Sequence, residues 1–436
     1  MEGRTIVQWD KEDLEIVGLL KVDLLSLGIL SAIRKTLALI PGMTFSTIPA
    51  EDPATYSMIQ RADTVGTFQI ESRAQMSMLP RLKPKTFYDL VIQVAIVRPG
   101  PIQGGMVHPY LRRRRGEEPI DMPHPLLQPI LGRTLGVPIF QEQVMKMAIV
   151  LARFTPGEAD QLRRAIGAWR SSGEIDRLGR KLMERLLEAG LPQEFVDRIF
   201  KQIHGFAEYG FPESHAASFA LIAYASAYLK CHHPTEFACG LINSQPMGFY
   251  SNATLVHDAK RHGSRILPVH PHLSEWDCVM EEGALRLGFR VVNGLGAEDA
   301  KALIEKRKQQ PFRNLPDFVS RTQLRLSVLQ ALALSGAFLC FGREPRDALW
   351  DVLAYTSDLL KDDPRDSSPE RQLSLFSKAP ESWISAEPNL KFSSLSYPET
   401  LQADYTAYSL STQGHPMSAL RLQRPDLPGA TSQWLK

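Results

Sequence analysis

The chain has 436 residues, of which 44% are hydrophobic and 22% charged, and its formal net charge at pH 7 is +2. This composition excludes a collagenous, low-complexity or wholly disordered chain, and the length predicts roughly three folding units. Because the net charge is small, any nucleic-acid surface must come from local clusters of Lys and Arg. Four cysteines without Cys-x-x-Cys spacing fit a reducing cytoplasm, and no segment predicts a signal peptide or a membrane span.

Residues 12–40 predict a strand followed by a helix. The stretch from Leu19 to Leu25 is mostly apolar, and strand alternation puts Lys21, Asp23 and Leu25 on one face. Asp23 therefore projects from the face opposite a buried side. A nucleotidyl transferase needs such carboxylates on rigid strands to hold Mg²⁺. From spacing alone, an edge-strand Asp paired with a nearby Lys is the stronger alternative.

The segment from about residue 55 to 245 is predicted to be one large helical domain. Within it, Thr155-Pro156-Gly157-Glu158 predicts a helix start with a capping box. The helix carries adjacent guanidinium groups at Arg163 and Arg164, which suit a triphosphate because each can clasp phosphate oxygens. A solvated helix face is the more common explanation of such a doublet.

A second helix start is predicted at Ser214, as the N-cap of a helix that runs to about Lys230. Anions bind well at helix N-termini, and His215 lies in that first turn. An anion contact is one interpretation of this helix start, but a single His is more often a structural hydrogen-bond donor than a nucleotide contact.

Four consecutive arginines form the densest positive run of the sequence: Arg112, Arg113, Arg114 and Arg115. They are predicted to track a DNA backbone, or else to stay hydrated and partly paired with Glu117 and Glu118, and the two interpretations weigh about evenly.

Residues 264–291 predict short strands that meet at Glu281-Glu282-Gly283, followed by a helix from Ala297 to Lys308. The turn between them, Val292 to Gly296, has the form of a helix-hairpin-helix motif. Its residues Asn293, Gly294 and Gly296, and Gly336 in a weaker second hairpin, are predicted DNA contacts because glycine lets backbone N–H groups approach a phosphate. An ordinary helical hairpin is the alternative.

The stretch from Asp362 to Glu381 predicts a polar linker. Its large apolar residues belong to a pentapeptide that predicts docking in a partner pocket and has the form of a sliding-clamp binding peptide: Gln372, Leu373, Ser374, Leu375 and Phe376. A zinc site at Cys231-His232-His233 with Cys239 is not expected, because the spacing fits no standard finger.

Taken in order, the motifs of the chain resemble those of bacterial C-family DNA polymerases, the polymerase III alpha type. The sequences that carry the resemblance are Lys21 to Gly28, Phe68-Gln69-Ile70-Glu71-Ser72, Arg98-Pro99-Gly100-Pro101, Gln141 to Met145, Leu162-Arg163-Arg164-Ala165 and Tyr209 to His215. The amino-acid sequences of Val22 to Gly28 and of residues 394–420 are most similar to those of the error-prone paralogue of the ImuC type. The replicative subunit is the nearer alternative.

The resemblance implies a mainly α fold with small β parts (α+β): a partial palm, a large helical fingers domain and a tandem helix-hairpin-helix domain. It implies the C-terminal part of the palm at 1–45, the fingers at 46–250 and the hairpin and clamp-binding domain at 251–350. A flexible linker with the clamp-like peptide would follow at 351–390, and residues 391–436 would lead toward an OB-fold.

The resemblance also implies a function and site residues. Asp23 is similar to the third catalytic aspartate and metal ligand of a two-Mg²⁺ site, and Arg163, Arg164, Ser214 and His215 resemble contacts to the incoming triphosphate. The implied reaction adds deoxynucleotides to a primer 3′ end, in damage-induced translesion synthesis. The implied partners are primer-template DNA, deoxynucleoside triphosphates, the sliding clamp and an accessory polymerase-like protein of the ImuB type.

The chain departs from the family pattern in ways that predict a fragment. It has no Asp-x-Asp pair, where family members carry two further metal ligands, and the PHP domain, thumb and OB-fold are not expected in it. Activity of this chain alone is therefore in doubt. The competing interpretations are a non-catalytic DNA-binding and clamp-tethering module, and a helical scaffold with solvated arginines.

Overall fold

A computed structural model of the chain describes residues 17–18, 28–167, 172–209, 211–247, 250–360 and 391–424. The predicted strand from Leu19 to Leu25 with Asp23, and the peptide from Gln372 to Phe376, lie outside these residues.

Helices dominate the described chain. In its first part they are α2 (Gly28–Leu39), η1 (Phe45–Thr47), α3 (Pro53–Gln60), α4 (Arg73–Leu82), α5 (Phe87–Ile96), α6 (Pro99–Gln103), α7 (Val107–Arg114), η2 (Pro125–Leu127), α8 (Gln128–Leu131), η3 (Gly132–Thr134), α9 (Gln141–Val150), α10 (Pro156–Gly167), α11 (Ser172–Glu188), α12 (Gln193–Tyr209) and α13 (Glu213–His232). In its second part they are α14 (Pro234–Ile242), α15 (Asn252–Arg261), η4 (Phe289–Val291), α16 (Ala297–Gln309), α17 (Leu315–Thr322), α18 (Leu326–Leu334), η5 (Ala337–Phe341), α19 (Pro345–Leu360), α20 (Tyr397–Tyr408) and α21 (Pro416–Gln423).

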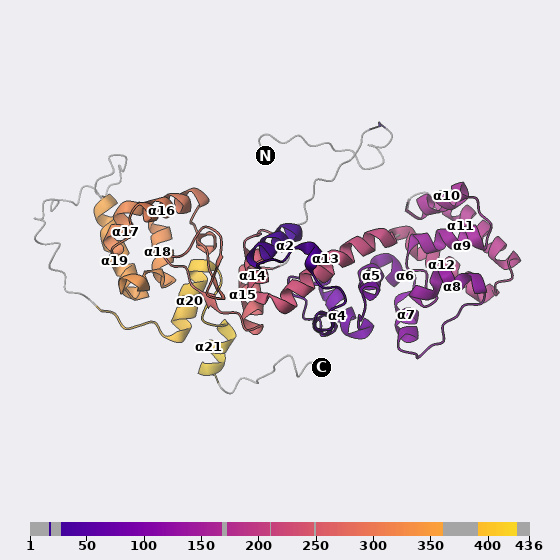
Figure 1. Ribbon diagram of the computed structural model, residues 1–436, viewed down its shortest axis with the longest axis horizontal. Coiled ribbons are helices and arrows are strands. Elements are labelled where there is room, and N and C mark those ends of the chain that lie inside the picture. The colour runs from indigo at the N-terminus through magenta and orange to yellow at the C-terminus, as the bar shows by residue number, and fades with distance from the viewer. Residues whose placement is uncertain are drawn as a thin grey trace, which may run out of the picture.

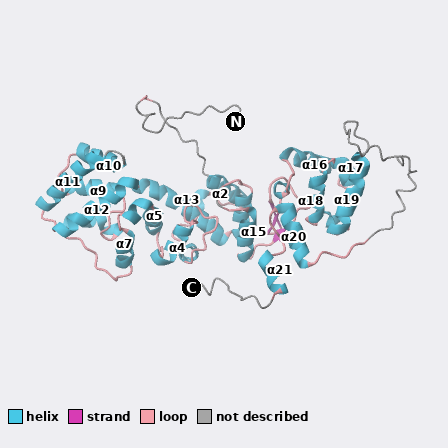
Figure 2. Ribbon diagram, turned by 180° about the vertical axis from the view of Figure 1, so that it is seen from behind, coloured by secondary structure: helices cyan, strands magenta, loops and turns pink. Residues whose placement is uncertain are grey.

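The molecule is elongated, with the two helical regions at opposite ends. Helices α7 to α12 gather at one end and α16 to α19 at the other, and the long helix α13 runs between the first group and the middle of the molecule (Figure 1). Seen from behind, the strands form one small patch beside α20 (Figure 2). The predicted fold, mainly α with small β parts, is confirmed.

The first hydrophobic core lies under α3 to α12 and most of α13. Helix α13 packs along α5, and both contribute fully buried residues such as Leu90, Val94 and Ala220. Alanines on the buried side of α13 let the two helices lie close together, because a small side chain adds little to the distance between their axes.

The second hydrophobic core joins α2, α14 and α15 to the sheet and to α16–α20. Helix α14 packs on α2 at Gly240, where a Cβ atom would lie only 2.7 Å from the Ala32 carbonyl oxygen. Glycine is therefore required at this crossing. The residues of the first core give way to those of the second within α13, between Ala227 and Leu229.

The sheet has three short strands: β1 (Ile266–Leu267), β2 (Val279–Glu281) and β3 (Ala284–Arg286), in the order β1-β3-β2. Strand β3 is parallel to β1 and antiparallel to β2. Glu282 and Gly283 turn between β2 and β3 with positive φ angles, so the hairpin predicted at these residues is confirmed.

Two predicted helix starts have different outcomes. The capping box at Thr155 is confirmed, because the Thr155 N–H donates to Glu158 Oε2 (2.9 Å) and the Glu158 N–H donates to Thr155 Oγ1 (3.2 Å). The N-cap predicted at Ser214 is wrong: α13 begins at Glu213 with Pro212 as its N-cap. The sequence alone could not show this start, because the Glu213 N–H donates to Glu142, a residue that is distant in the sequence.

None of the helices in the described part of the chain is long and apolar enough to cross a membrane.

Candidate nucleotide and DNA contacts

A row of four rings, two of them on α13, lies at the start of this helix. The His215 imidazole lies 4.9 Å from the Phe211 ring and 4.2 Å from the Phe219 ring, centroid to centroid, and Phe219 in turn meets Phe68 at 5.0 Å. Phe68 belongs to the Phe68-to-Ser72 motif, so this row joins two of the segments that carry the family resemblance. Ser214 and His215 themselves are exposed.

Arg98 places positive charge beside these rings. Its guanidinium carbon lies 3.7 Å above the centre of the Phe211 ring, which is the geometry of a cation–π contact. Partial burial and the nearby Arg98 charge lower the pKa of His215 below its ordinary value. At neutral pH the imidazole is therefore uncharged and can donate one hydrogen bond next to a guanidinium.

The arginine doublet lies on α10, as predicted. Arg163 forms an ion pair with Asp160 one turn earlier at 2.9 Å, and Arg164 lies on the next position of the helix, with a side chain outside the described part. Helix α10 packs on α12, which packs on α6, the helix that begins after Arg98. The fold thus connects the doublet to Arg98 through two helix contacts.

A network that the sequence did not predict holds the start of α13. The Glu213 N–H donates to Glu142 Oε2 (3.0 Å), and the Tyr88 hydroxyl donates to Glu213 Oε1 (2.8 Å). Arg133 stacks on the Tyr88 ring, 3.5 Å from its centre. In the sequence, the motif Gln141 to Met145, which contains Glu142, is the signal that points to this network. These contacts fix the helix end from which His215 projects.

The four arginines of the predicted DNA contact are paired within the chain. Arg112 and Arg113 share Glu118 (2.8 and 2.9 Å), Arg114 pairs with Asp89 (2.6 Å) and Arg115 with Glu117 (3.1 Å). Arg113 has a side chain that is only 3% exposed, and its Nη1 donates to the Leu135 carbonyl, so it serves the fold. Arg112 and Arg115 are 49% exposed and remain a proposed DNA contact.

The first predicted hairpin lies between η4 and α16. Gly294 has φ +81°, which favours glycine. Asn293 is engaged elsewhere: its N–H donates to the Ala407 carbonyl and its Nδ2 to the Thr406 carbonyl, both at the end of α20 (2.8 Å each). Gly296 is the N-cap of α16 and is exposed.

Acidic side chains flank that helix start. Glu298 and Asp299 lie in the first turn of α16, and Asp299 faces Arg325 at 3.7 Å. Carboxylates here weaken the attraction of the helix end for a phosphate. In the second hairpin, Gly336 has φ +73° and joins α18 to η5.

A buried charge network joins α13 to α15. The Lys230 ammonium is nearly inaccessible, and it lies 2.6 Å from Asp258 Oδ2, 3.3 Å from Asp63 Oδ1 and 2.9 Å from the Val65 carbonyl. A hydrogen bond of 2.7 Å joins His262 Nε2 to Asp63 Oδ2. Ligand atoms of Asp63, Asp258 and His262 lie within 4.8 Å of one another, but the Lys230 cation already pairs with both carboxylates.

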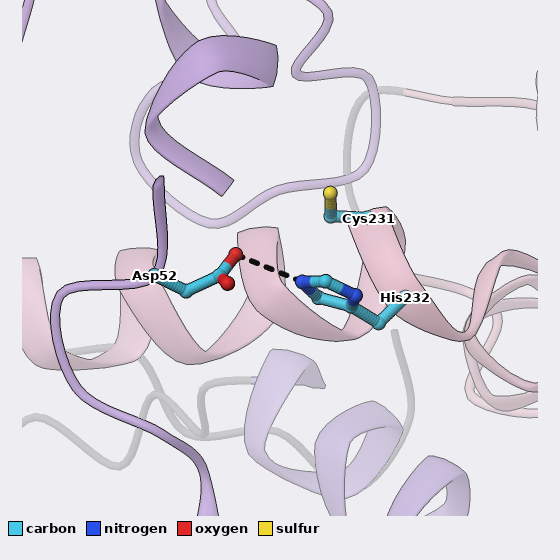
Figure 3. Close-up of side chains that lie close together, drawn as sticks. All are labelled: Asp52, Cys231 and His232. Atoms are coloured by element: carbon cyan, nitrogen blue, oxygen red, sulfur yellow. Dashed lines mark hydrogen bonds and ion pairs between the residues drawn. The ribbon is translucent and has the colours of Figure 1, made fainter. Parts of the chain in front are cut away.

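A second group with metal-ligand atoms contains Asp52, Cys231 and His232 (Figure 3). Asp52 caps α3 through Thr55, and the same oxygen meets His232 Nε2 at 2.8 Å. Burial raises the pKa of the Cys231 thiol, which disfavours the thiolate that a metal needs. Cys239 lies in the second core and donates to the Cys278 carbonyl, away from this group. Neither group offers the all-oxygen ligand set that Mg²⁺ prefers.

Comparison with known proteins identifies the two regions of the fold. Residues 29–190 match the bacterial DNA polymerase III alpha subunit finger domain, and residues 263–348 match the helix-hairpin-helix motif. These two regions are similar to parts of the bacterial C-family DNA polymerases. Over nearly its whole length the chain is also similar to proteins called error-prone DNA polymerase.

Three such relatives show how far the similarity extends. The error-prone DNA polymerase of Methylococcus capsulatus is 48% identical over 464 residues, which cover 100% of this chain and 43% of the relative. Those of Alkalilimnicola ehrlichii and Pseudomonas aeruginosa are 51% and 49% identical, over 97% of this chain and 40% of each relative. The chain thus spans about two fifths of the length of these relatives.

Proposed function

We propose that this chain is the part of an error-prone DNA polymerase that binds the incoming deoxynucleoside triphosphate and holds primed DNA, in damage-induced translesion synthesis. The observation that carries the proposal is the site at the start of α13, where Arg98 and His215 both contact the Phe211 ring and Arg98 belongs to the residues that match the polymerase finger domain.

In the proposed site, Arg98 supplies positive charge for the triphosphate. The neutral His215 imidazole and the Ser214 hydroxyl supply hydrogen-bond donors, and both are exposed on the first turns of α13. Arg163 and Arg164 are proposed to approach the outer phosphates from α10. An entering phosphate would compete with Asp160 for Arg163, since that ion pair is half exposed and therefore weak.

The chemical step is proposed to follow the two-metal scheme of nucleotidyl transfer, with Asp23 as one carboxylate ligand of Mg²⁺. When bound, Mg²⁺ would neutralise charge on the triphosphate and activate the primer 3′ hydroxyl. The described residues of this chain would bind and orient the nucleotide, and further carboxylates would have to join Asp23.

Primed DNA is proposed to contact the two hairpins near Gly294 and Gly336, with Gly296 and the exposed Arg112 and Arg115 as further contacts. The pentapeptide Gln372 to Phe376 is proposed to bind the sliding clamp, and an accessory polymerase-like protein is a proposed partner. The cytoplasm is the proposed compartment.

The experiment combines DNA binding and primer extension with the purified chain. Affinity for a primer-template is measured between 50 and 200 mM salt, and extension is measured with Mg²⁺ and all four deoxynucleotides. We expect salt-dependent binding without extension, because Asp23 alone does not complete a metal site. Extension would show that the chain itself completes that site, and absence of DNA binding would overturn the proposal.

A further inference from the structure

A recess of about 640 Å³ lies between the end of α4 and helix α7, and its walls are strongly basic. Six cationic residues line it: Arg81, Lys83, Lys85, Arg113, Arg114 and Arg115. The other lining residues are apolar, so the recess contains no carboxylate.

Two of these cations build the wall. Arg114 donates to the carbonyl oxygens of Leu82 (2.6 Å) and Lys83 (3.0 Å), which end α4, while its Nη1 binds the buried Asp89 at 2.6 Å. Burial would raise the pKa of Asp89, but Arg114 holds it below its ordinary value, so the pair stays charged. Arg113 is held in the same way by Glu118 and a carbonyl oxygen.

The other face of the recess presents cations that have no ion-pair partner among the described residues. Every second residue at the end of α4 and just after it is a cation: Arg81, Lys83 and Lys85. All three are exposed. Lys83 ends α4 in a left-handed conformation (φ 50°), which turns the chain there. Within the described part of the molecule, none of these three side chains forms an ion pair.

Cations held this close together repel one another, and a bound anion would relieve the repulsion. The recess has the volume of a small-ligand pocket, and its lining offers positive charge to phosphate groups. It has no aromatic side chain on which a base would stack, so its contacts suit phosphates.

We propose that Arg81, Lys83 and Lys85 bind the sugar-phosphate backbone of single-stranded DNA in this recess, independently of sequence. This inference deepens the proposed function, because the template ahead of a primer end is single-stranded. It adds a DNA contact made by Arg81, Lys83 and Lys85, whereas Arg112 to Arg115 are paired with carboxylates of the chain.

The test compares two triple variants of the full chain. R81Q/K83Q/K85Q removes the proposed contacts, and Lys146→Gln with Lys201→Gln and Arg421→Gln removes the same charge from exposed positions elsewhere. Binding of a fluorescent oligothymidylate is measured from 50 to 200 mM salt. We expect the recess variant to lose about tenfold in affinity at low salt and its salt slope to fall by about 2, since each single-strand phosphate contact contributes about 0.7.

Three outcomes would overturn the inference: no binding of oligothymidylate by the unmodified chain, equal losses in both triple variants, or an equal loss of blunt-duplex binding in the recess variant. The proposed function is tested separately, by duplex and triphosphate binding. If the chain binds neither duplex nor triphosphate but still binds oligothymidylate through the recess, the proposed polymerase role is overturned and the recess inference is retained.

Discussion

At the scale of single residues, the sequence indicated which side chains carry charge but not which of them are free. For the basic run Arg112 to Arg115, the pairing with Glu117 and Glu118 that the sequence offered as an alternative is found. The partner of Arg114 could not be predicted, because Asp89 lies 25 residues away and this pair depends on tertiary packing. The network around Glu213 was missed for the same reason, whereas the Thr155 capping box is local and was predicted correctly.

Glu71 shows how burial changes a residue of a recognised motif. Burial raises the pKa of Glu71 to about 7, while a hydrogen bond from Gly66 and the charge of Lys230 oppose the rise. The folded state therefore holds this proton more tightly than the unfolded state does. The stability that results is fully present below pH 4.5 and is lost as the pH rises through about 7.

We predict that Glu71→Gln removes this dependence. The free energy of unfolding of the variant, relative to the unmodified chain, should increase between pH 4.5 and 7 by on the order of 3 kcal/mol at most. Urea titrations at five pH values in this window measure the difference, and other titrating groups cancel between the two proteins. A constant difference across the window would contradict the prediction.

At the scale of helices and turns, the strand hairpin at Glu282 and the helix beginning at Ala297 followed the sequence closely, because turn chemistry and periodicity are local. The docking of Asn293 on the end of α20 was not predictable, since more than a hundred residues separate it from Thr406. In the first hairpin turn, the N–H groups of Asn293 are therefore already used in hydrogen bonds to α20.

Gly294 allows a test of that turn. A Cβ added there would meet only Val328, at an ordinary 3.7 Å, so the cost of Gly294→Ala comes from its φ of +81°. We predict a loss of about 1 kcal/mol in stability, measured by thermal or urea unfolding. Gly294→Asn is the matched control, because Asn tolerates this conformation and should lose less. Equal stability of the Ala variant and the unmodified chain would contradict the prediction.

At the scale of the whole molecule, two hydrophobic cores meet along one continuous helix, α13 (Figure 1). The boundary near residue 250 between the fingers and the hairpin region stays a prediction. The change of core within α13 could not be predicted, because the packing of α2 and α14 into the second core is a long-range contact without a local signal. Lys230 ties α13 to α15 just beyond this point, through Asp258.

We predict that Lys230→Met destabilises this junction. The variant keeps the length of the side chain but removes the buried cation from Asp258 and Asp63, which keep only their contacts with the more exposed Arg261 and His262, at a cost of about 3 kcal/mol. Urea unfolding measures the loss, and Lys146→Met, at an exposed position, is the control. A loss below about 1 kcal/mol would show that the network does not hold the cores together.

The most direct test of the central claim is equilibrium binding of a fluorescent deoxynucleoside triphosphate, with Mg²⁺ and primer-template DNA present. The account predicts that Arg98→Ala and His215→Ala each weaken binding about tenfold or more, while the exposed His108→Ala has no effect. Equal affinity in all four proteins would contradict the claim that the start of α13 binds the incoming nucleotide.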